Sequence, residues 1–180
     1  HFEQALKNPI FKTIASCAEA LETPCYVVGG YVRDFILSRH KSQDIDVVAI
    51  GNGIELAESV AKALPNASKV SIFKTYGTAM LRFKGIDLEF VGARKESYKK
   101  ESRNPEICEG TIEDDQKRRD FTINALAISL NANDYGTLID PFSGIEDLKN
   151  KRIVTPLNPN LTFSDDPLRM LRAIRFATQL

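Results

Sequence analysis

Two aspartates separated by one apolar residue, Asp44 and Asp46, are the residues that most directly suggest chemistry. They open a run rich in β-branched residues at 44–50, which predicts a buried strand. Residues two apart on a strand project to the same face, so the two Cα atoms lie about 7 Å apart. Such carboxylates repel unless a cation lies between them, and Mg²⁺ takes carboxylate and phosphate oxygens as ligands. The alternative is an exposed strand edge with two solvated acids, but a buried strand makes uncompensated carboxylates unfavourable.

A third carboxylate could complete such a site. Asp87 and Glu89 share one face of the extended run 86–91. Glu89 is our choice for a metal ligand or for a base beside an attacking hydroxyl, and Asp87 is the alternative. Two metal ions about 3.5–4 Å apart can activate an attacking oxygen and stabilise a leaving one. The acidic residues therefore predict two-metal chemistry on a phosphate.

A glycine pair, Gly29-Gly30, lies upstream between a predicted strand at 25–28 and a predicted helix at 31–38. A glycine turn at a helix N-terminus presents backbone N–H groups that suit phosphate oxygens. Arg33, on the first turn of that helix, could also reach a phosphate. A glycine pair alone is more often simple loop geometry, so this prediction depends on the neighbouring aspartates.

The elements that must position these residues alternate in an order typical of an α+β domain, with one mixed or antiparallel sheet and helices mainly on one face. Three extended runs at 69–75, 78–84 and 86–91 predict an antiparallel meander. The charged segment 94–119 lacks periodicity and predicts a mobile, solvated loop. Further helices are predicted at 10–21 (opened by Pro9), 54–64, 120–130, 145–150 and 166–180, and further strands at 137–139 and 152–155.

Composition excludes several classes of protein. The 180 residues contain 24 Lys and Arg against 24 Asp and Glu, so the net charge is zero and a basic domain that coats nucleic acid is disfavoured. Cys17, Cys25 and Cys108 are widely spaced, which indicates neither a disulfide framework nor a zinc site and favours the cytoplasm. No apolar run is long enough for a membrane span, so we expect no membrane partner.

Four motifs in order resemble the class II tRNA nucleotidyltransferases of the polymerase-beta-like superfamily. That family comprises CCA-adding enzymes, their C-adding and A-adding variants, and bacterial poly(A) polymerases. The motifs are residues 28–34, Asp44-Ile45-Asp46, residues 118–125 and residues 165–172, and the resemblance extends over residues 25–180. It implies a nucleotidyltransferase head at 1–155, followed by the start of a helical neck at 156–180 that we expect to be truncated.

The resemblance also implies roles for individual residues. The metal ligands would be Asp44 and Asp46, and Glu89 would be the third catalytic carboxylate. Asp165 stands where the family commonly has Glu, which leaves the role of this acid in doubt. Segment 95–117 matches a flexible element of the family. Nucleotide would be bound by Gly29, Gly30 and Arg33 (triphosphate), by Arg119, Asp120 and Asn124 (sugar and phosphates), and by Asp166, Arg169 and Arg172 in the last motif.

Within that last motif, Asp166 and Arg169 are three residues apart on the predicted helix, so they share one face and could read the base of cytosine or adenine. The alternative is a surface salt bridge. For Asp120, the alternative is a simple helix N-cap.

The expected function is addition of C and A to tRNA 3′ ends from CTP and ATP, with two Mg²⁺ ions and release of pyrophosphate. A poly(A) polymerase or an enzyme adding only C or only A is the first alternative, and a non-catalytic nucleotide-binding module is the second. The zero net charge fits this function if the tRNA is gripped mainly by domains absent from this chain. The oligomeric state is left open.

Overall fold

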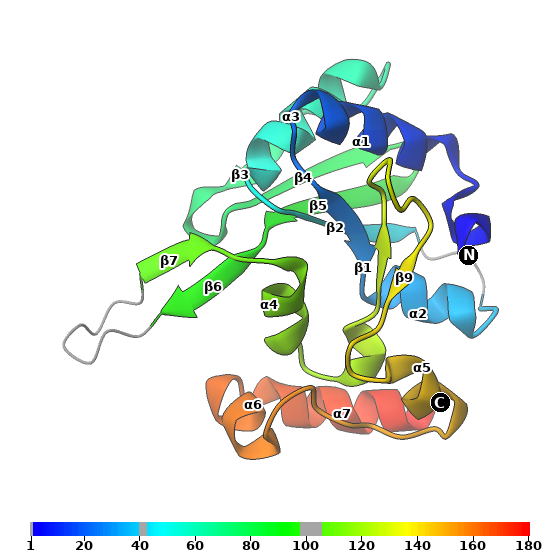
Figure 1. Cartoon of the computed structure of the whole chain (residues 1–180), viewed down its shortest axis with the longest axis vertical. Helices are drawn as coiled ribbons and strands as arrows, with labels where there is room; N and C mark the ends of the chain where they lie inside the picture. Colours follow the sequence, from blue (N-terminus) through cyan, green and yellow to red (C-terminus); the bar gives the residue numbers. More distant parts are fainter. Residues whose placement is uncertain (1, 40–42, 98–105) are drawn as a thin grey trace.

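The centre of the structure, a computed structural model that describes residues 2–39, 43–97 and 106–180, is a mixed β-sheet (Figure 1). Within these residues the sheet has seven strands in the order β3-β4-β5-β2-β1-β8-β9. β2 (Asp44–Ala49) is parallel to β5 (Ile86–Gly92) and antiparallel to β1 (Cys25–Val28), and the other neighbours are antiparallel. The predicted α+β class with a mixed sheet is confirmed.

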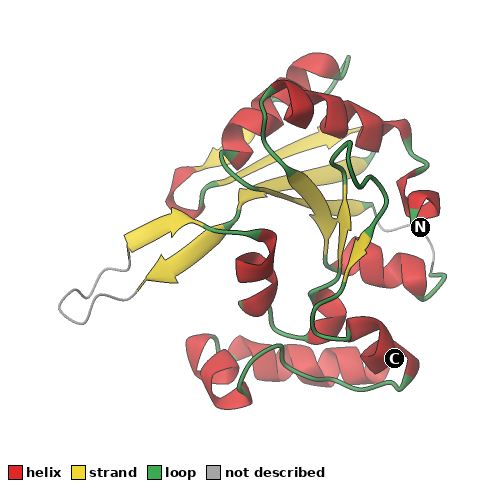
Figure 2. Cartoon of the chain, viewed as in Figure 1, coloured by secondary structure: helices red, strands yellow, loops and turns green. Residues whose placement is uncertain are grey.

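Helices surround this sheet, and a separate hairpin projects from it (Figure 2). Figure 1 shows α1 and α3 on one side, α6 and α7 in the most distant layer on the other, and α4 between that layer and the sheet. The remaining strands are β3 (Ser71–Phe73), β4 (Thr78–Phe83), β8 (Ala127–Ser129), β9 (Leu138–Ile139) and the hairpin strands β6 (Arg94–Ser97) and β7 (Glu106–Glu109). The helices are α1 (Pro9–Ala20), α2 (Gly30–Ile36), α3 (Gly53–Ala63), α4 (Ile112–Lys117), α5 (Gly144–Lys149), α6 (Pro159–Asp165) and α7 (Leu168–Gln179), with 3₁₀ turns at Glu3–Leu6, Lys74–Tyr76 and Thr122–Asn124.

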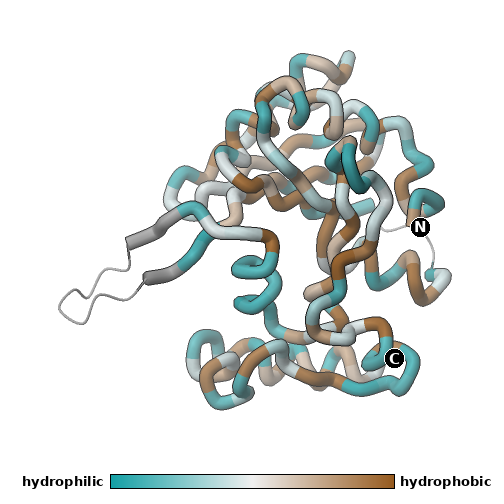
Figure 3. The backbone as a smooth tube through the Cα atoms, viewed as in Figure 1, coloured by the Kyte–Doolittle hydropathy of each residue, from teal (hydrophilic) through white to brown (hydrophobic). Residues whose placement is uncertain are grey.

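Alternation along β2 gives the sheet two different faces. Ile45 and Val47 are buried in the main core together with Ile14 of α1 and Val60 of α3. The aspartates of β2 project to the opposite face, because side chains alternate along a strand. The apolar strands run through the interior while α4 is mainly hydrophilic (Figure 3). The core thus fixes which face carries the acidic residues.

Local signals in the sequence set several element boundaries. The side chain of Asn8 accepts a hydrogen bond from the Ile10 N–H at 3.1 Å, and Pro9 follows as the first helical residue of α1. Asn52 caps α3 in the same way, by accepting from the Glu55 N–H. The predicted meander is confirmed as the antiparallel succession β3, β4 and β5.

The predicted helix at 120–130 is wrong. Thr122–Asn124 forms a single 3₁₀ turn, and Ala127–Ser129 forms β8, which pairs with β1. The Asp120 Oδ1 atom accepts from the Phe121 N–H and from the Asn124 side chain, so Asp120 is not a helix N-cap. Residues 121–130 are all buried, and a short buried apolar run fits a strand as well as a helix.

The predicted loop at 94–119 is also wrong over its described parts. β6 and β7 form an antiparallel hairpin in which Arg94 lies opposite Glu109, so opposite charges stabilise the pairing. Thr111 and Asp114 then form a capping box that begins α4. Residues 98–105, which fall within the predicted loop, lie outside the described residues.

Two predictions near the C-terminus also differ from the structure. Residues 152–155 form no strand, although the Val154 carbonyl accepts a hydrogen bond from the Thr122 N–H at 2.8 Å. The last helix begins at Leu168 and not at Asp166, because Asp166 precedes Pro167 and is held in an extended conformation.

Two expectations drawn from composition can be compared with the structure. In the described ranges, no helix is long and apolar enough to cross a membrane. Cys17 and Cys25 are buried free thiols, and burial raises the pKa of Cys25 to about 12. These two thiols therefore form part of the core.

Candidate active site

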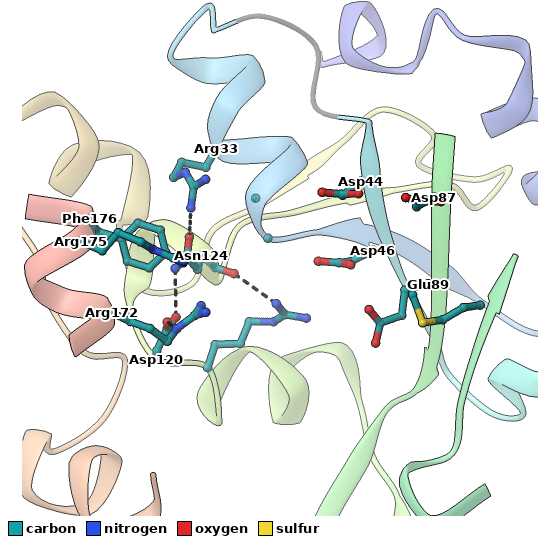
Figure 4. Close-up of a pocket in the computed structure, with 14 residues that line it drawn as sticks. Arg33, Asp44, Asp46, Asp87, Glu89, Asp120, Asn124, Arg172, Arg175 and Phe176 are labelled. Atoms are coloured by element: carbon teal, nitrogen blue, oxygen red, sulfur yellow. Dashed lines mark hydrogen bonds and ion pairs between the residues drawn. The ribbon is translucent and has the colours of Figure 1, made fainter. Parts of the chain in front are cut away.

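A cavity of about 480 Å³ lies between the acidic face of the sheet and α7 (Figure 4). Acidic side chains from β2 and β5 line one side of it, and cationic side chains from α2 and α7 line the other. Of the predicted site residues, those that line it are Gly29, Gly30, Arg33, Asp44, Asp46, Glu89, Arg119, Asp120, Asn124 and Arg172. The structure therefore brings together residues from five separate stretches of the sequence.

The carboxylates are aligned by the parallel pairing of β2 with β5. Asp44 lies opposite Asp87, and Asp46 lies opposite Glu89, so all four side chains share one face. Spacing in the sequence left Glu89 and Asp87 close to equivalent. In the structure both line the pocket, and Glu89 is the one beside Asp46.

The two central carboxylates are held where ionisation is disfavoured. Burial raises the pKa of Asp46; Arg119 opposes this shift, while Asp44 and Asp115 add to it. Burial and the charge of Asp46 raise the pKa of Glu89. A divalent cation would relieve this repulsion, and Mg²⁺ commonly binds through one or two carboxylates together with substrate phosphates. The residues present therefore fit such an ion, although no group of three or more His, Cys, Asp or Glu in the described part of the chain is placed to hold a metal by itself.

The turn at Gly29 brings the backbone close to this centre. Gly29 has φ +73°, and a Cβ atom there would lie 3.2 Å from Arg119 Nη1 and 3.6 Å from Asp46 Oδ2. Only glycine suits this position. The Gly29 N–H donates to the Leu126 carbonyl at 3.1 Å, so this N–H is used within the fold and does not offer the phosphate contact that was predicted for it.

A hydrogen-bond chain joins α2 to α7 on the side of the pocket opposite the carboxylates (Figure 4). Arg33 Nη1 donates to Asn124 Oδ1 at 2.5 Å, and Asn124 Nδ2 donates to Asp120 Oδ1 at 3.0 Å. Arg172 Nε donates to Asp120 Oδ2 at 2.7 Å. This chain orients the Asn124 amide and fixes both arginines beside the cavity.

Arg119 is held in place by a residue that the sequence analysis did not select. Asp115 is fully buried and accepts from Arg119 Nε and Arg118 Nη2, both at 2.8 Å. Asp115 precedes Arg118 and Arg119 by three and four residues, and this spacing could have indicated that they form ion pairs. Arg119 is thereby held close enough to Asp46 to lower the pKa of the Asp46 carboxyl, which partly offsets the rise caused by burial.

Arg175 and Phe176 of α7 were also not selected, although both line the pocket. Phe176 is 4% exposed, and the guanidinium carbons of Arg33, Arg172 and Arg175 lie 5.0, 5.3 and 5.0 Å from its ring centroid. Cation–π attraction helps to hold these like charges side by side. Arg175 and Phe176 follow Arg172 by three and four residues on α7, and this helical spacing was the signal that could have identified them. The pocket therefore combines a carboxylate centre with a cluster of cations that suits a polyphosphate.

Asp166 and Arg169 do not lie in this pocket. Asp166 precedes α7 and its Oδ1 atom accepts from the Leu168 N–H at 3.0 Å, so the two side chains do not share one helix face as predicted. Arg169 donates to the carbonyls of Thr162 and Arg118 at 3.0 and 2.9 Å, and it lines a neighbouring cavity. A role of these two residues in base reading stays a prediction.

Two curated relatives are similar to this chain in sequence. The A-adding tRNA nucleotidyltransferase of Aquifex aeolicus (strain VF5) is 46% identical over 155 residues, which are 86% of this chain and 18% of that protein. The CCA-adding enzyme of Anoxybacillus flavithermus (strain DSM 21510 / WK1) is 37% identical over 178 residues, which are 96% of this chain and 42% of that protein. The chain thus spans less than half the length of either relative.

Structural similarity agrees with these sequence matches. A crystal structure of a tRNA nucleotidyltransferase complexed with a primer tRNA and an incoming ATP analog superposes with a TM-score of 0.77 at 41% identity, over 91% of this chain and 44% of that chain. The profile of the poly A polymerase head domain matches residues 25–154. The chain therefore belongs to the poly A polymerase head-domain family, which is the family of the class II tRNA nucleotidyltransferases that its motifs resemble.

Proposed function

We propose that this chain is the catalytic head of a template-independent RNA nucleotidyltransferase that adds C and A to tRNA 3′ ends from CTP and ATP in the cytoplasm. The observation that carries the proposal is the pocket itself, in which a carboxylate centre faces arginines from α2 and α7. The names of the two relatives support the substrate class. The boundary between a head at 1–155 and a neck at 156–180 is part of this proposal.

In the proposed reaction, the 3′-hydroxyl oxygen of the RNA forms a bond to the α-phosphorus of the nucleotide while the bond to pyrophosphate breaks. Asp44 and Asp46 would hold two Mg²⁺ ions, which stabilise negative charge on the attacking and leaving oxygens when bound. Glu89 accepts the hydroxyl proton, a role that suits its raised pKa. Arg33, with Gly30 beside it, contacts the triphosphate.

In this proposal, Asp120 and Asn124 contact the ribose. Their hydrogen bonds to Arg172 and Arg33 fix the direction of each polar group before a ligand arrives. Hydrogen bonds to ribose hydroxyls would favour ribonucleotides over deoxyribonucleotides. Base reading by Asp166 and Arg169 is a further part of the proposal, and it requires that the segment before α7 turn toward the pocket when nucleotide binds.

The test uses the full-length protein. Asp44→Ala or Asp46→Ala should abolish incorporation into a tRNA lacking CCA, and the circular dichroism spectrum should be unchanged. Glu58→Gln, an exposed acid on α3, is the control and should retain wild-type activity. Normal turnover in either aspartate variant would refute the assignment, and nucleotide binding by the wild type without pyrophosphate release would favour a non-catalytic module.

Addition of A alone is the second candidate function. It is supported by the A-adding tRNA nucleotidyltransferase of Aquifex aeolicus, which is 46% identical to this chain over 155 residues. Offering CTP and ATP separately to tRNA lacking CCA and to tRNA ending in CC distinguishes the two. An A-only enzyme extends only the second RNA, and only with ATP, whereas a poly(A) polymerase adds a long run of A.

A further inference from the structure

A second cavity, of about 380 Å³, meets the active-site pocket at Asp46, Glu89 and Arg119. These residues form a wall common to both cavities. The glycine turn and Arg33 line the first cavity and, within the described residues, not the second. The rest of the second cavity is lined by Tyr76, Thr78, Val91, Arg94 and Arg118.

A third cavity, of about 530 Å³, lies next to the second. The two share the lining residues Arg94 and Arg118, so the second cavity is a neighbour of both the first and the third. The described side chains that line the third cavity include five cations and two acids: Arg94, Lys95, Lys117, Arg118 and Arg169 against Asp114 and Asp165. Basic character therefore increases with distance from the acidic centre.

The order of the cavities matches the geometry of nucleotidyl transfer. In an in-line displacement, the attacking oxygen and the leaving oxygen lie on opposite sides of the phosphorus. If the triphosphate lies against Arg33 and the glycine turn, the attacking hydroxyl must approach from the other side of the carboxylates. The wall at Asp46 and Glu89 is where a ligand in the second cavity would meet it.

The chemistry of the second and third cavities suits single-stranded RNA. Such sites combine a positively charged groove for the backbone with aromatic side chains on which bases stack. Tyr76 is 64% exposed, so its ring is accessible at the second cavity. Arg94 and Arg118 line both the second and the third cavity, so they supply positive charge to each.

We propose that the 3′-terminal nucleotide of the RNA acceptor binds in the second cavity with its base stacked on Tyr76. The preceding phosphates follow Arg94 and Arg118 into the third cavity. This assignment rests on the proposed function, and it gives the RNA strand a contact within this chain in addition to any tRNA grip in absent domains.

The experiment measures the KM for an RNA ending in CC and the KM for ATP separately, in the full-length protein. Tyr76→Ala should raise the RNA KM between about fivefold and a hundredfold, the effect of losing one base–aromatic stack, and should leave the ATP KM within about twofold. Tyr76→Phe retains the ring and should behave as wild type. Because Tyr76 is exposed, neither substitution should alter the fold, which circular dichroism checks.

The backbone contact is tested by salt dependence. Arg94→Gln should lower the slope of log K for RNA binding against log salt by about one, as loss of one phosphate contact does. Lys62→Gln, an exposed cation on α3, is the matched control and should leave the slope unchanged. If the wild type extends RNA but Tyr76→Ala leaves its RNA KM unchanged, or raises the ATP KM instead, the RNA path is overturned and the proposed function stands. If the wild type extends no RNA, the proposed function itself fails.

Discussion

Removing one charge from the carboxylate centre should stabilise the protein while it abolishes activity. Asp44 and Asp46 share a strand face with Cα atoms about 7 Å apart. At an effective dielectric constant of about 20, two such charges repel by about 2 kcal/mol. Solvent screening of the partly exposed pair reduces this to about 1 kcal/mol. Asp46→Asn should therefore raise the Tm by about 2–4 °C in buffer containing a metal chelator.

The pKa of Asp46 gives the same sign. Because it is raised from its ordinary value of 3.8 in the folded state, the folded protein holds the proton more tightly than the unfolded chain. The resulting stability is present at low pH and is lost as the pH rises through the raised folded pKa. The Tm difference between Asp46→Asn and wild type should thus be largest near neutral pH and should shrink as the pH falls toward 3.8.

The assay is thermal unfolding with and without Mg²⁺-ATP. Ligand at about a hundred times its Kd stabilises a folded protein by about 2.7 kcal/mol, so wild type should overtake the variant when Mg²⁺-ATP is added. Glu58→Gln removes an exposed carboxylate elsewhere and should follow wild type under both conditions. A variant no more stable than wild type in chelator would refute the reasoning that the centre is strained by its charges.

Two other substitutions test the positioning of groups in the site. Gly29→Ala and Gly85→Ala both place a side chain at positive φ (73° and 77°), so each should lower the free energy of unfolding by about 1–3 kcal/mol, measured in denaturant. Only Gly29→Ala should also lower kcat, by at least about tenfold. A Cβ atom at Gly85 meets nothing within 4 Å, whereas one at Gly29 would lie close to Arg119 and Asp46. Equal kcat in both variants would contradict this account of Gly29. Asp166→Ala and Asp166→Ser should both relax the preference for CTP and ATP over UTP and GTP. Only serine keeps an acceptor for the Leu168 N–H, so the pair of variants separates base reading from the local hydrogen bond. Unchanged selectivity in competition assays would count against base reading.

The acidic centre was predictable because it depends on local alternation. Residue types at 44–50 indicate a buried strand, and the period of two then fixes the face that Asp44 and Asp46 share. The choice between Glu89 and Asp87 was not predictable, since it depends on the parallel register of β5 against β2. Spacing within one strand does not contain that register.

Errors in the predicted elements came from segments whose conformation depends on distant partners. Residues 127–129 become a strand because β1, about a hundred residues earlier, offers an unpaired edge. The hairpin of β6 and β7 has no alternation of apolar and polar residues, and it forms through cross-strand pairs such as Arg94 with Glu109. Patterns along the chain do not report either kind of pairing.

Net charge describes the chain less well than the positions of its charges. A total of zero disfavours a basic domain that coats nucleic acid, but the charges are separated in space: acids on β2 and β5, arginines on α2 and α7, and a basic cavity beside α4. Because the Debye length is about 8 Å at physiological ionic strength, a phosphate responds to the few charges nearest to it and not to the total. A site that holds cations at one point and polyanions next to it needs both acidic and basic side chains, so a net charge near zero is expected. Binding of a phosphate then depends on the sign of the charge at each point between the carboxylates and the third cavity.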